Sequence, residues 1–316
     1  MSLRFVARVG VLVTLIAVGA ACGDPPPPVA ARRESVAAWP DVFDGTPEIY
    51  AVVRPQALKR DGVYGAFWKS LLRVAQARGF MRGATMVEAT EGAEEIIVGL
   101  NKGSDAALVF RGVPASLDPQ KIADADGHAL FRPVNGGGTG NHPDDGAKIL
   151  EYELVDRRVT DGGLFVLPDR TWVGALGEAR ARARRAFAAP MNRPAPKVDG
   201  DALAAIRFSG PIAHLLERHP MWGVFAKKLV NATFTLKPGK GGVVVELLYE
   251  DNSRAAYAEM QGKRMVEELA AKDEKRFGWL KGSKVAYEGN TVVFHVAVPP
   301  RLLEDLPNAS GADFGL

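Results

Sequence analysis

The stretch YGAFWKSL at residues 64–71 recurs in altered form as WGVFAKKL at residues 222–229. Five of the eight aligned positions are identical or exchange one aromatic residue for another. A short apolar segment precedes each copy, at residues 51–54 in the first case and at residues 204–207 in the second. Either the chain repeats a strand followed by an amphipathic helix, or two unrelated amphipathic helices share a common pattern.

The similarity continues downstream of both helices, which favours a repeat. In each half, two candidate strands follow one another, then a helix, and then a second pair of strands. The helix is short in the first half, near residues 119–123, and long in the second, over residues 253–272. The candidate strands are 95–100, 106–111, 149–153 and 163–167 in the first half, and 232–237, 242–249, 285–288 and 291–298 in the second.

This order of strand, helix, strand, strand, helix and strand is that of a ferredoxin-like unit. We therefore expect an α+β protein made of two degenerate tandem β-α-β-β-α-β (ferredoxin-like) repeats, with a mainly antiparallel sheet and helices on one face. The repeats occupy residues 39–190 and 200–307, with prolines between them and a loose tail over residues 308–316. The first half carries an extra strand at 171–177 and an extra helix at 178–189.

The beginning of the chain has the three parts of a secretory signal. Arg4 and Arg8 form a basic region, residues 9–21 form an apolar run, and small residues stand directly before Cys22. The apolar run is shorter than the roughly 20 residues that a membrane-spanning helix needs. We expect residues 1–21 to be a signal peptide that is removed on export.

These residues resemble the signal of a bacterial lipoprotein. The resemblance is carried by VGAAC at residues 18–22, although Gly19 stands where the family usually has Leu, Val or Ile. It implies that Cys22 is lipidated and becomes the first residue of a mature chain held in the bacterial cell envelope. The alternative is an ordinary signal peptide cut near Ala21, with Cys22 incidental.

Cysteine usage supports lipidation. Cys22 is the only cysteine of the 316 residues, so it has no partner for an internal disulfide, and acylation would remove an exposed thiol from an oxidising compartment. Residue 23 is Gly, and the family resemblance then implies the outer membrane rather than the inner one, because Asp at this place retains lipoproteins in the inner membrane. Residues 22–38, with prolines at 25–28, predict an extended tether.

The charge of the mature chain excludes one class of partner. The full sequence contains 40 basic and 37 acidic side chains, and removal of the signal takes away Arg4 and Arg8, which leaves 38 against 37. A nearly neutral chain has no general attraction for nucleic acid. We expect the partners to be the membrane, through the lipid anchor, and an envelope protein or a small ligand that the sequence does not identify.

Two loops have compositions similar to those of ligand-binding loops, but neither has the complete motif of a phosphate-binding or calcium-binding loop. The glycine-rich residues 136–140 are followed by Asn, His and Pro instead of the Lys-Ser/Thr and helix start of a phosphate loop. Asp124 and Asp126 match part of a calcium loop, but Ile122 and Pro133 stand at two of its ligand positions. We interpret both as polar surface loops and predict no cofactor.

We also predict no metal site and no catalytic residue. His214 and His219 are five residues apart on a predicted helix and so face different directions, which excludes a shared zinc ion. The other histidines, His128, His142 and His295, are expected to be solvated or structural. The sequence has no G-x-S-x-G nucleophile motif, and a lipidated Cys22 cannot act as a nucleophile.

Two groups of residues remain open to a functional reading. Arg180, Arg182, Arg184 and Arg185 crowd one predicted helix, either as a patch for lipid head groups or an acidic polymer, or as a solvated helix face, which we favour. The aromatic residues of the two matched stretches could line a ligand groove between the halves or lie in the core, which we favour. These are Tyr64, Phe67, Trp68, Trp222 and Phe225.

The sequence therefore predicts a lipid-anchored cell-envelope protein that acts as a non-catalytic binding or scaffolding module. Two alternatives stay open. One is an envelope hydrolase whose site is assembled from residues dispersed along the sequence. The other is a carrier that holds an apolar ligand between the repeats.

Overall fold

The computed structural model describes residues 39–43, 45, 47–77, 84–101, 105–123, 127–134, 149–155, 161–191, 193–195, 198–209, 223–239 and 242–299. These residues form two compact units. The N-terminal unit contains residues 39–57 and 75–198, and the C-terminal unit contains residues 58–74 together with residues 199–299. The C-terminal unit is thus built from two separate parts of the chain.

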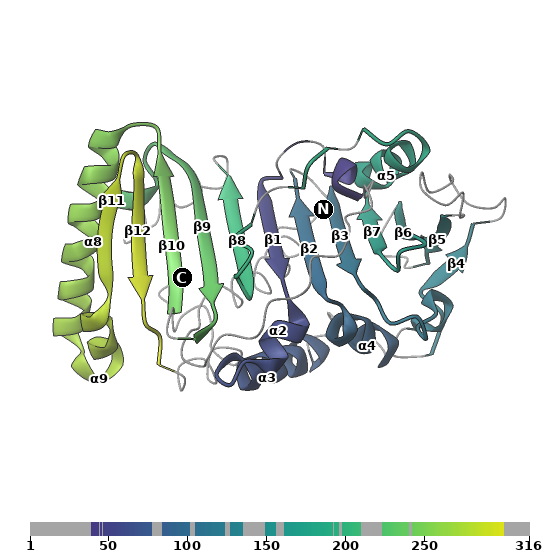
Figure 1. The fold of residues 1–316 in the computed structure, drawn as a ribbon, viewed down its shortest axis with the longest axis horizontal. Coiled ribbons are helices and arrows are strands. Elements are labelled where there is room, and N and C mark those ends of the chain that lie inside the picture. The colour runs from purple at the N-terminus through teal and green to yellow at the C-terminus, as the bar shows by residue number, and fades with distance from the viewer. Residues whose placement is uncertain are drawn as a thin grey trace. The chain divides into compact units, whose positions relative to one another are not determined.

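The N-terminal unit is an antiparallel sheet with helices packed against it (Figure 1). In spatial order its strands are β1 (Ile49–Val53), β2 (Glu95–Leu100), β3 (Ala106–Arg111), β7 (Trp172–Leu176), β6 (Gly162–Val166), β5 (Leu150–Leu154) and β4 (Phe131–Pro133). Its helical elements are η1 (Trp39–Val42), α4 (Ala84–Gly92), η2 (Pro119–Lys121) and α5 (Glu178–Ala188), and α2 (Pro55–Arg60) begins in this unit.

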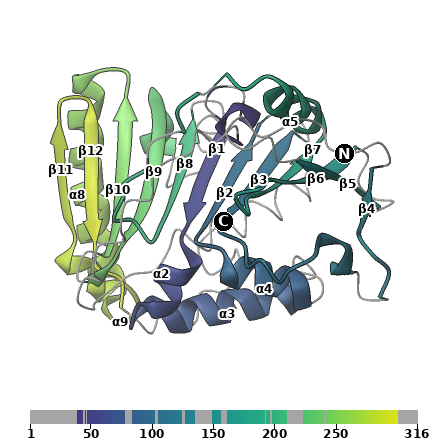
Figure 2. The same cartoon turned by 45° about the vertical axis from the view of Figure 1, so that its right-hand side comes forward.

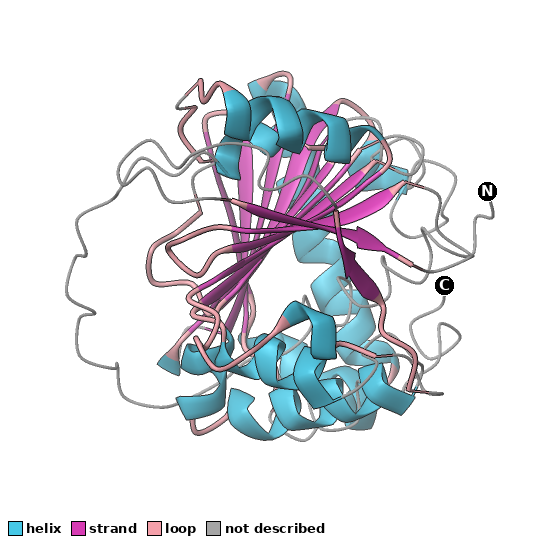
Figure 3. Cartoon of the chain, turned by 90° about the vertical axis from the view of Figure 1, so that its right-hand side faces the viewer, coloured by secondary structure: helices cyan, strands magenta, loops and turns pink. Residues whose placement is uncertain are grey.

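The C-terminal unit has a second antiparallel arrangement. In spatial order its strands are β11 (Lys284–Glu288), β12 (Thr291–Val296), β10 (Gly242–Tyr249), β9 (Leu229–Lys237) and β8 (Ala204–Ser209). Its helical elements are α3 (Tyr64–Ala77), α7 (Gly223–Ala226), α8 (Asn252–Lys272), α9 (Glu274–Phe277) and η4 (Gly278–Gly282). Neighbouring strands are rotated relative to one another, as the strand arrows of Figure 3 show, which is the normal twist of a sheet.

The core of the N-terminal unit lies between its sheet and α5. Tyr50 and Val52 of β1 pack there with Trp39 of η1 and Phe187 of α5. A Cβ atom at Gly99 of β2 would lie 2.4 Å from the ring of Phe43, so glycine is what lets this ring reach the sheet. Because β1 is buried at all five positions, both of its faces are covered.

The core of the C-terminal unit lies beneath α8. This helix buries Ala255 and Ala258 against a cluster that includes Tyr249, Phe225 and Phe294. Asp251 caps the helix, because its carboxylate accepts a hydrogen bond from the backbone N–H of Arg254 at 2.7 Å. Because Ala255 and Ala258 are small, this side of α8 can lie close to the strands.

The fold class and the antiparallel pairing are confirmed. All eight strands expected from the two halves are present within a few residues of their expected limits, as β2, β3, β5, β6, β9, β10, β11 and β12. The extra strand and the extra helix of the first half are also confirmed, as β7 and α5. Within the described ranges, no helix is long and apolar enough to span a membrane.

The tandem ferredoxin-like repeats are not confirmed. A ferredoxin-like unit places another strand between the two strands that flank its first helix. Here β8 pairs directly with β9 in antiparallel orientation, and β1 pairs directly with β2. Helices on one face only are not confirmed either, because β1 is covered on both faces.

The two matched stretches form different structures. The first begins α3, which runs for 14 residues from Tyr64. The second contains only the four-residue helix α7, and the last matched residue, Leu229, already begins β9. The backbone of Lys228 has φ of +61°, a left-handed conformation that ends the helix without the glycine that usually marks such a position.

Candidate functional site

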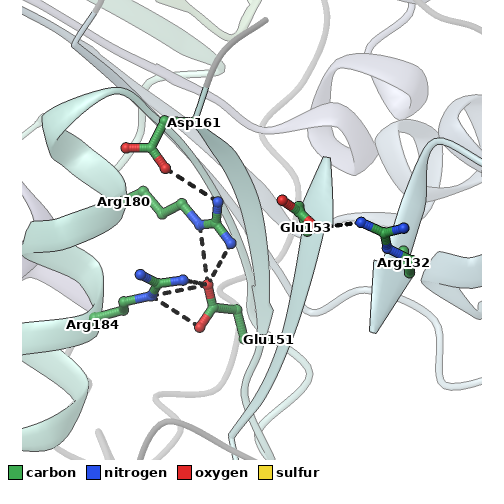
Figure 4. A network of polar contacts seen from close by, with 6 residues as sticks. All are labelled: Arg132, Glu151, Glu153, Asp161, Arg180 and Arg184. Atoms are coloured by element: carbon green, nitrogen blue, oxygen red, sulfur yellow. Dashed lines mark hydrogen bonds and ion pairs between the residues drawn. The ribbon is translucent and has the colours of Figure 1, made fainter. Parts of the chain in front are cut away.

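The arginines of α5 lie in a network of ion pairs (Figure 4). Arg180 donates from Nε and Nη2 to Oε1 of Glu151 on β5, at 3.0 and 2.9 Å. Arg184 donates to the same carboxylate, with its shortest contact at 2.6 Å from Nη2 to Oε1. Nη1 of Arg180 also donates to Asp161 at 3.2 Å. One carboxylate therefore holds two guanidinium groups that are a single helical turn apart.

The solvated helix face that we expected is wrong for Arg180 and Arg182. The side chain of Arg180 is 8% exposed and that of Glu151 only 1% exposed. Arg182 is 11% exposed and pairs with Asp105 at 2.5 Å, while its Nε donates to the carbonyl of Val42. These charges hold α5 to β5 and to η1. Arg184 and Arg185 are exposed, so the expected solvated face is reduced to these two arginines.

The electrostatics of the network are close to balanced. Arg180 and Arg184 carry two positive charges opposite the carboxylates of Glu151 and Asp161. The hydrogen bond to Glu151 raises the pKa of the Arg184 guanidinium above its usual value. Such a pair stabilises a fold only while both partners are present, because a buried charge without its counter-ion is costly. The network is a structural clamp, and we call it the α5 clamp.

The described aromatic residues of the matched stretches lie in the core, which confirms for them the interpretation we favoured. Tyr64, Phe67 and Trp68 of α3 are between 0 and 3% exposed, and Phe225 of α7 is 4% exposed. The ring of Phe225 packs edge-on against Phe294 at 6.0 Å between centroids. Trp222 lies outside the described residues.

The described histidines are exposed, as expected. His128 follows η2, and His295 is on β12, where its side chain reaches solvent. Within the described ranges, no group of three or more His, Cys, Asp or Glu residues is placed to hold a metal ion. The other predicted features lie outside these ranges, namely Cys22, His142, His214, His219, Asp124, Asp126 and the glycine-rich residues 136–140.

A pocket of about 620 Å³ opens beside α8 in the C-terminal unit. One wall is the C-terminal half of α8, and the other is formed by η4 and the beginning of β11. Figure 2 shows β11 beside α8. Three lysines give it its charge, and we call it the lysine pocket. Its lining residues are Lys263, Val266, Glu267, Ala270, Ala271, Lys281, Ser283, Lys284 and Val285.

The lysines of the pocket differ in their partners. Lys263 pairs with Glu259 at 2.7 Å and Lys281 pairs with Glu274 at 2.5 Å, in both cases with exposed lysine side chains. The hydrogen bond from Lys281 lowers the pKa of Glu274. Exposed pairs of this kind contribute about 1 kcal/mol or less, so an anionic ligand can replace the carboxylate. Within the described structure, Lys284 has no ion pair.

The polar groups of the pocket also include one buried hydroxyl. Oγ of Ser283 is shielded from solvent and has no hydrogen-bond partner among the described residues. A buried polar atom is costly when it is unpaired, so a ligand that bonds to it gains affinity. Glu267 lies on the opposite wall with Val266 and the two alanines. The pocket therefore offers ammonium groups and a hydroxyl beside a small apolar surface.

Sequence reasoning missed this pocket. It predicted the helix at 253–272 and the strand at 285–288 separately, and both are present. Lys281 and Lys284 were overlooked because lysines before a strand are ordinary surface residues. The sequence signal that could have identified them is that Lys281 and Lys284 flank Ser283 where the predicted strand begins. In the structure this strand is at the edge of its sheet.

Comparison with known proteins shows a similarity of fold to solved structures. No protein-family model and no curated protein matches the chain. Among solved structures, crystal form IV of TP0453 has a TM-score of 0.50 at 9% identity, covering 85% of this chain and 96% of that one. Crystal form I has a TM-score of 0.49 at 11% identity, covering 84% and 94%. Crystal form III has a TM-score of 0.49 at 8% identity, covering 85% and 97%. The chain is thus similar to TP0453 in fold.

Proposed function

We propose that this protein is a lipid-anchored binding protein of the bacterial cell envelope, attached through Cys22 and without catalytic chemistry. The attachment is supported by the signal-like residues 1–21 and by the single cysteine that follows them. Gly23 supports the outer membrane as its location. The tether at residues 22–38 would hold the two units away from the bilayer surface.

The observation that carries the binding role is the lysine pocket. Its volume of about 620 Å³ lies within the range of about 300–1,000 Å³ that is typical of small-ligand sites. Its walls are regular elements, α8 and β11, and not loops alone. Rigid walls preserve the spacing of the lysines, which favours a specific ligand over a general scaffolding role.

We also infer that the two units are diverged copies of one ancestral repeat. Each contains three strands that are consecutive in the sheet and pair antiparallel, β1 to β3 and β8 to β10. A helix lies between the first and second strand of each set.

Two measurements test the proposed function. Labelled palmitate should enter the wild-type protein in its own envelope and should not enter Cys22→Ala. Affinity capture of the mature protein, with mass spectrometry of retained peptides and small molecules, should recover a ligand that is lost from Lys281→Ala/Lys284→Ala. A ligand retained equally by this double variant would exclude the lysine pocket as the binding site.

A further inference from the structure

The strand that borders the lysine pocket is at the edge of its sheet. In the described part of the chain, β11 pairs with β12 alone, and four of its five residues are exposed. An edge strand has a row of backbone donors and acceptors that another extended chain can bond. Many proteins recognise peptides by adding them as a strand at such an edge.

The pairing register shows which groups face the open edge. The backbone N–H of Tyr249 on β10 donates to the carbonyl of Asn290 at 2.9 Å. Because bonding alternates along an antiparallel strand, Val292 and Phe294 also bond to β10, and the residues between them bond to β11. The backbone groups of Val285 and Tyr287 on β11 therefore point away from β12.

The pocket lies at the N-terminal end of β11, where Lys281, Ser283 and Lys284 are found. A peptide that pairs antiparallel with β11 runs in the opposite direction, so its C-terminus arrives at this end. A C-terminal carboxylate carries a negative charge and would meet Lys284, which has no ion pair among the described residues. Charge and chain direction thus agree on the same end of the strand.

We propose that the β11 edge binds an extended peptide in antiparallel orientation, with its C-terminal carboxylate in the lysine pocket. Lys284 pairs with the carboxylate, and the buried hydroxyl of Ser283 donates a hydrogen bond to it. Ala270 and Ala271 leave room for a small apolar side chain at the last position, while Glu267 disfavours an acidic one. This inference rests on the proposed role as a binding protein and specifies its ligand.

The first test compares two probes that differ by one group. An acetylated hexapeptide of alternating threonine and valine, ending in valine with a free carboxylate, is titrated into the full chain in detergent by calorimetry. The same peptide with a C-terminal amide is the control. The acid should bind at least about tenfold more tightly, because a hydrogen bond to an ionised group is stronger than one to a neutral amide. Equal affinity would overturn the role of the carboxylate.

The second test uses variants of the strand and the pocket. Tyr287→Pro removes an outward N–H that bonds to no other described residue, so it should abolish binding and leave the circular dichroism spectrum unchanged. Tyr287→Ala, which keeps the N–H, should bind the acid as the wild type does. Lys284→Gln should reduce the affinity for the acid to that for the amide.

Three outcomes would overturn the proposal. One is full binding by Tyr287→Pro, because strand addition needs the edge donor. Another is a wild-type dimer that Tyr287→Pro dissociates in sedimentation, because a second copy would then occupy the edge. The third is a wild type that binds neither peptide. In that last case the labelling of Cys22 still tests the proposed attachment independently.

Discussion

Glu151 is the residue on which the α5 clamp depends, because Arg180 and Arg184 both donate hydrogen bonds to its carboxylate inside the N-terminal unit. Replacing it in Glu151→Ala leaves Arg180 buried without its main counter-ion. The expected cost is about 3–5 kcal/mol in the free energy of unfolding. Urea denaturation followed by circular dichroism measures it.

The matched control lies two residues along the same strand. Glu153 pairs with Arg132 at 2.8 Å, but both side chains are largely exposed, at 44% and 68%. Glu153→Ala should therefore change the urea midpoint very little. A similar loss in both variants would show that the α5 clamp owes nothing to burial.

Gly163 on β6 gives a second measurement of the same clamp. A Cβ atom at this position would lie 2.7 Å from Nε of Arg180 and 3.3 Å from the carbonyl oxygen of Tyr152. Gly163→Ala should displace the guanidinium and reduce stability by about 1–3 kcal/mol. Gly174→Ala on β7 is the control, since its Cβ atom meets nothing closer than 3.7 Å. If the two variants unfolded at the same urea concentration, the Arg180 side chain could move aside without loss of stability, which would contradict the prediction.

The N-terminus of α8 is sensitive to pH through Asp251. The hydrogen bond from Lys228, followed by that from the backbone N–H of Arg254, lowers the pKa of this carboxyl. A lowered pKa in the folded state adds stability above the unfolded pKa, near 4, and this stability is lost as the pH falls through the lower folded value.

Two substitutions at this position separate the cap from the charge. Asp251→Ala should unfold at lower urea than the wild type at pH 7, and the difference should shrink below about pH 4. Asp251→Asn keeps a capping oxygen without the charge, so it should remain closer to the wild type at pH 7 than Asp251→Ala does. Denaturation at pH 7 and pH 3 checks both. A difference for Asp251→Ala that does not change with pH would contradict the role of the ionised carboxylate.

The elements that sequence could predict were those with a strong internal period. The strands β2, β3 and β10 and the helix α8 have apolar residues at regular spacing and clear turn residues at their ends, so their limits were predicted closely. The pairing partner of each strand could not be predicted in the same way. The same local pattern in β8 and β9 is compatible with direct antiparallel pairing, which the structure shows, and with a crossover connection. The α5 clamp was missed because Glu151 and Arg180 are 29 residues apart.

The whole molecule should be held to the membrane by acyl chains and not by charge. The proposed mature chain is nearly neutral, with 38 basic and 37 acidic side chains, so added salt would have little electrostatic attraction to the membrane to screen. We expect 1 M NaCl to leave the protein in the membrane fraction and detergent to release it. Cys22→Ala should appear in the soluble fraction without detergent. Release of the wild type by salt alone would contradict a lipid anchor.

The composition of the C-terminal unit limits the order in which this chain can fold. Residues 58–74 belong to that unit, and the hydroxyl of Tyr64 contacts the carbonyl of Lys237, 173 positions later. During synthesis α3 is made early, but the strands of its own unit are made much later. Bringing α3 together with these strands closes a long chain segment, which slows folding. Cutting the gene in the proline-containing segment before residue 199 would therefore not yield two independent halves. The later fragment would lack the buried aromatic residues of α3, and only co-expression with the earlier fragment could restore them.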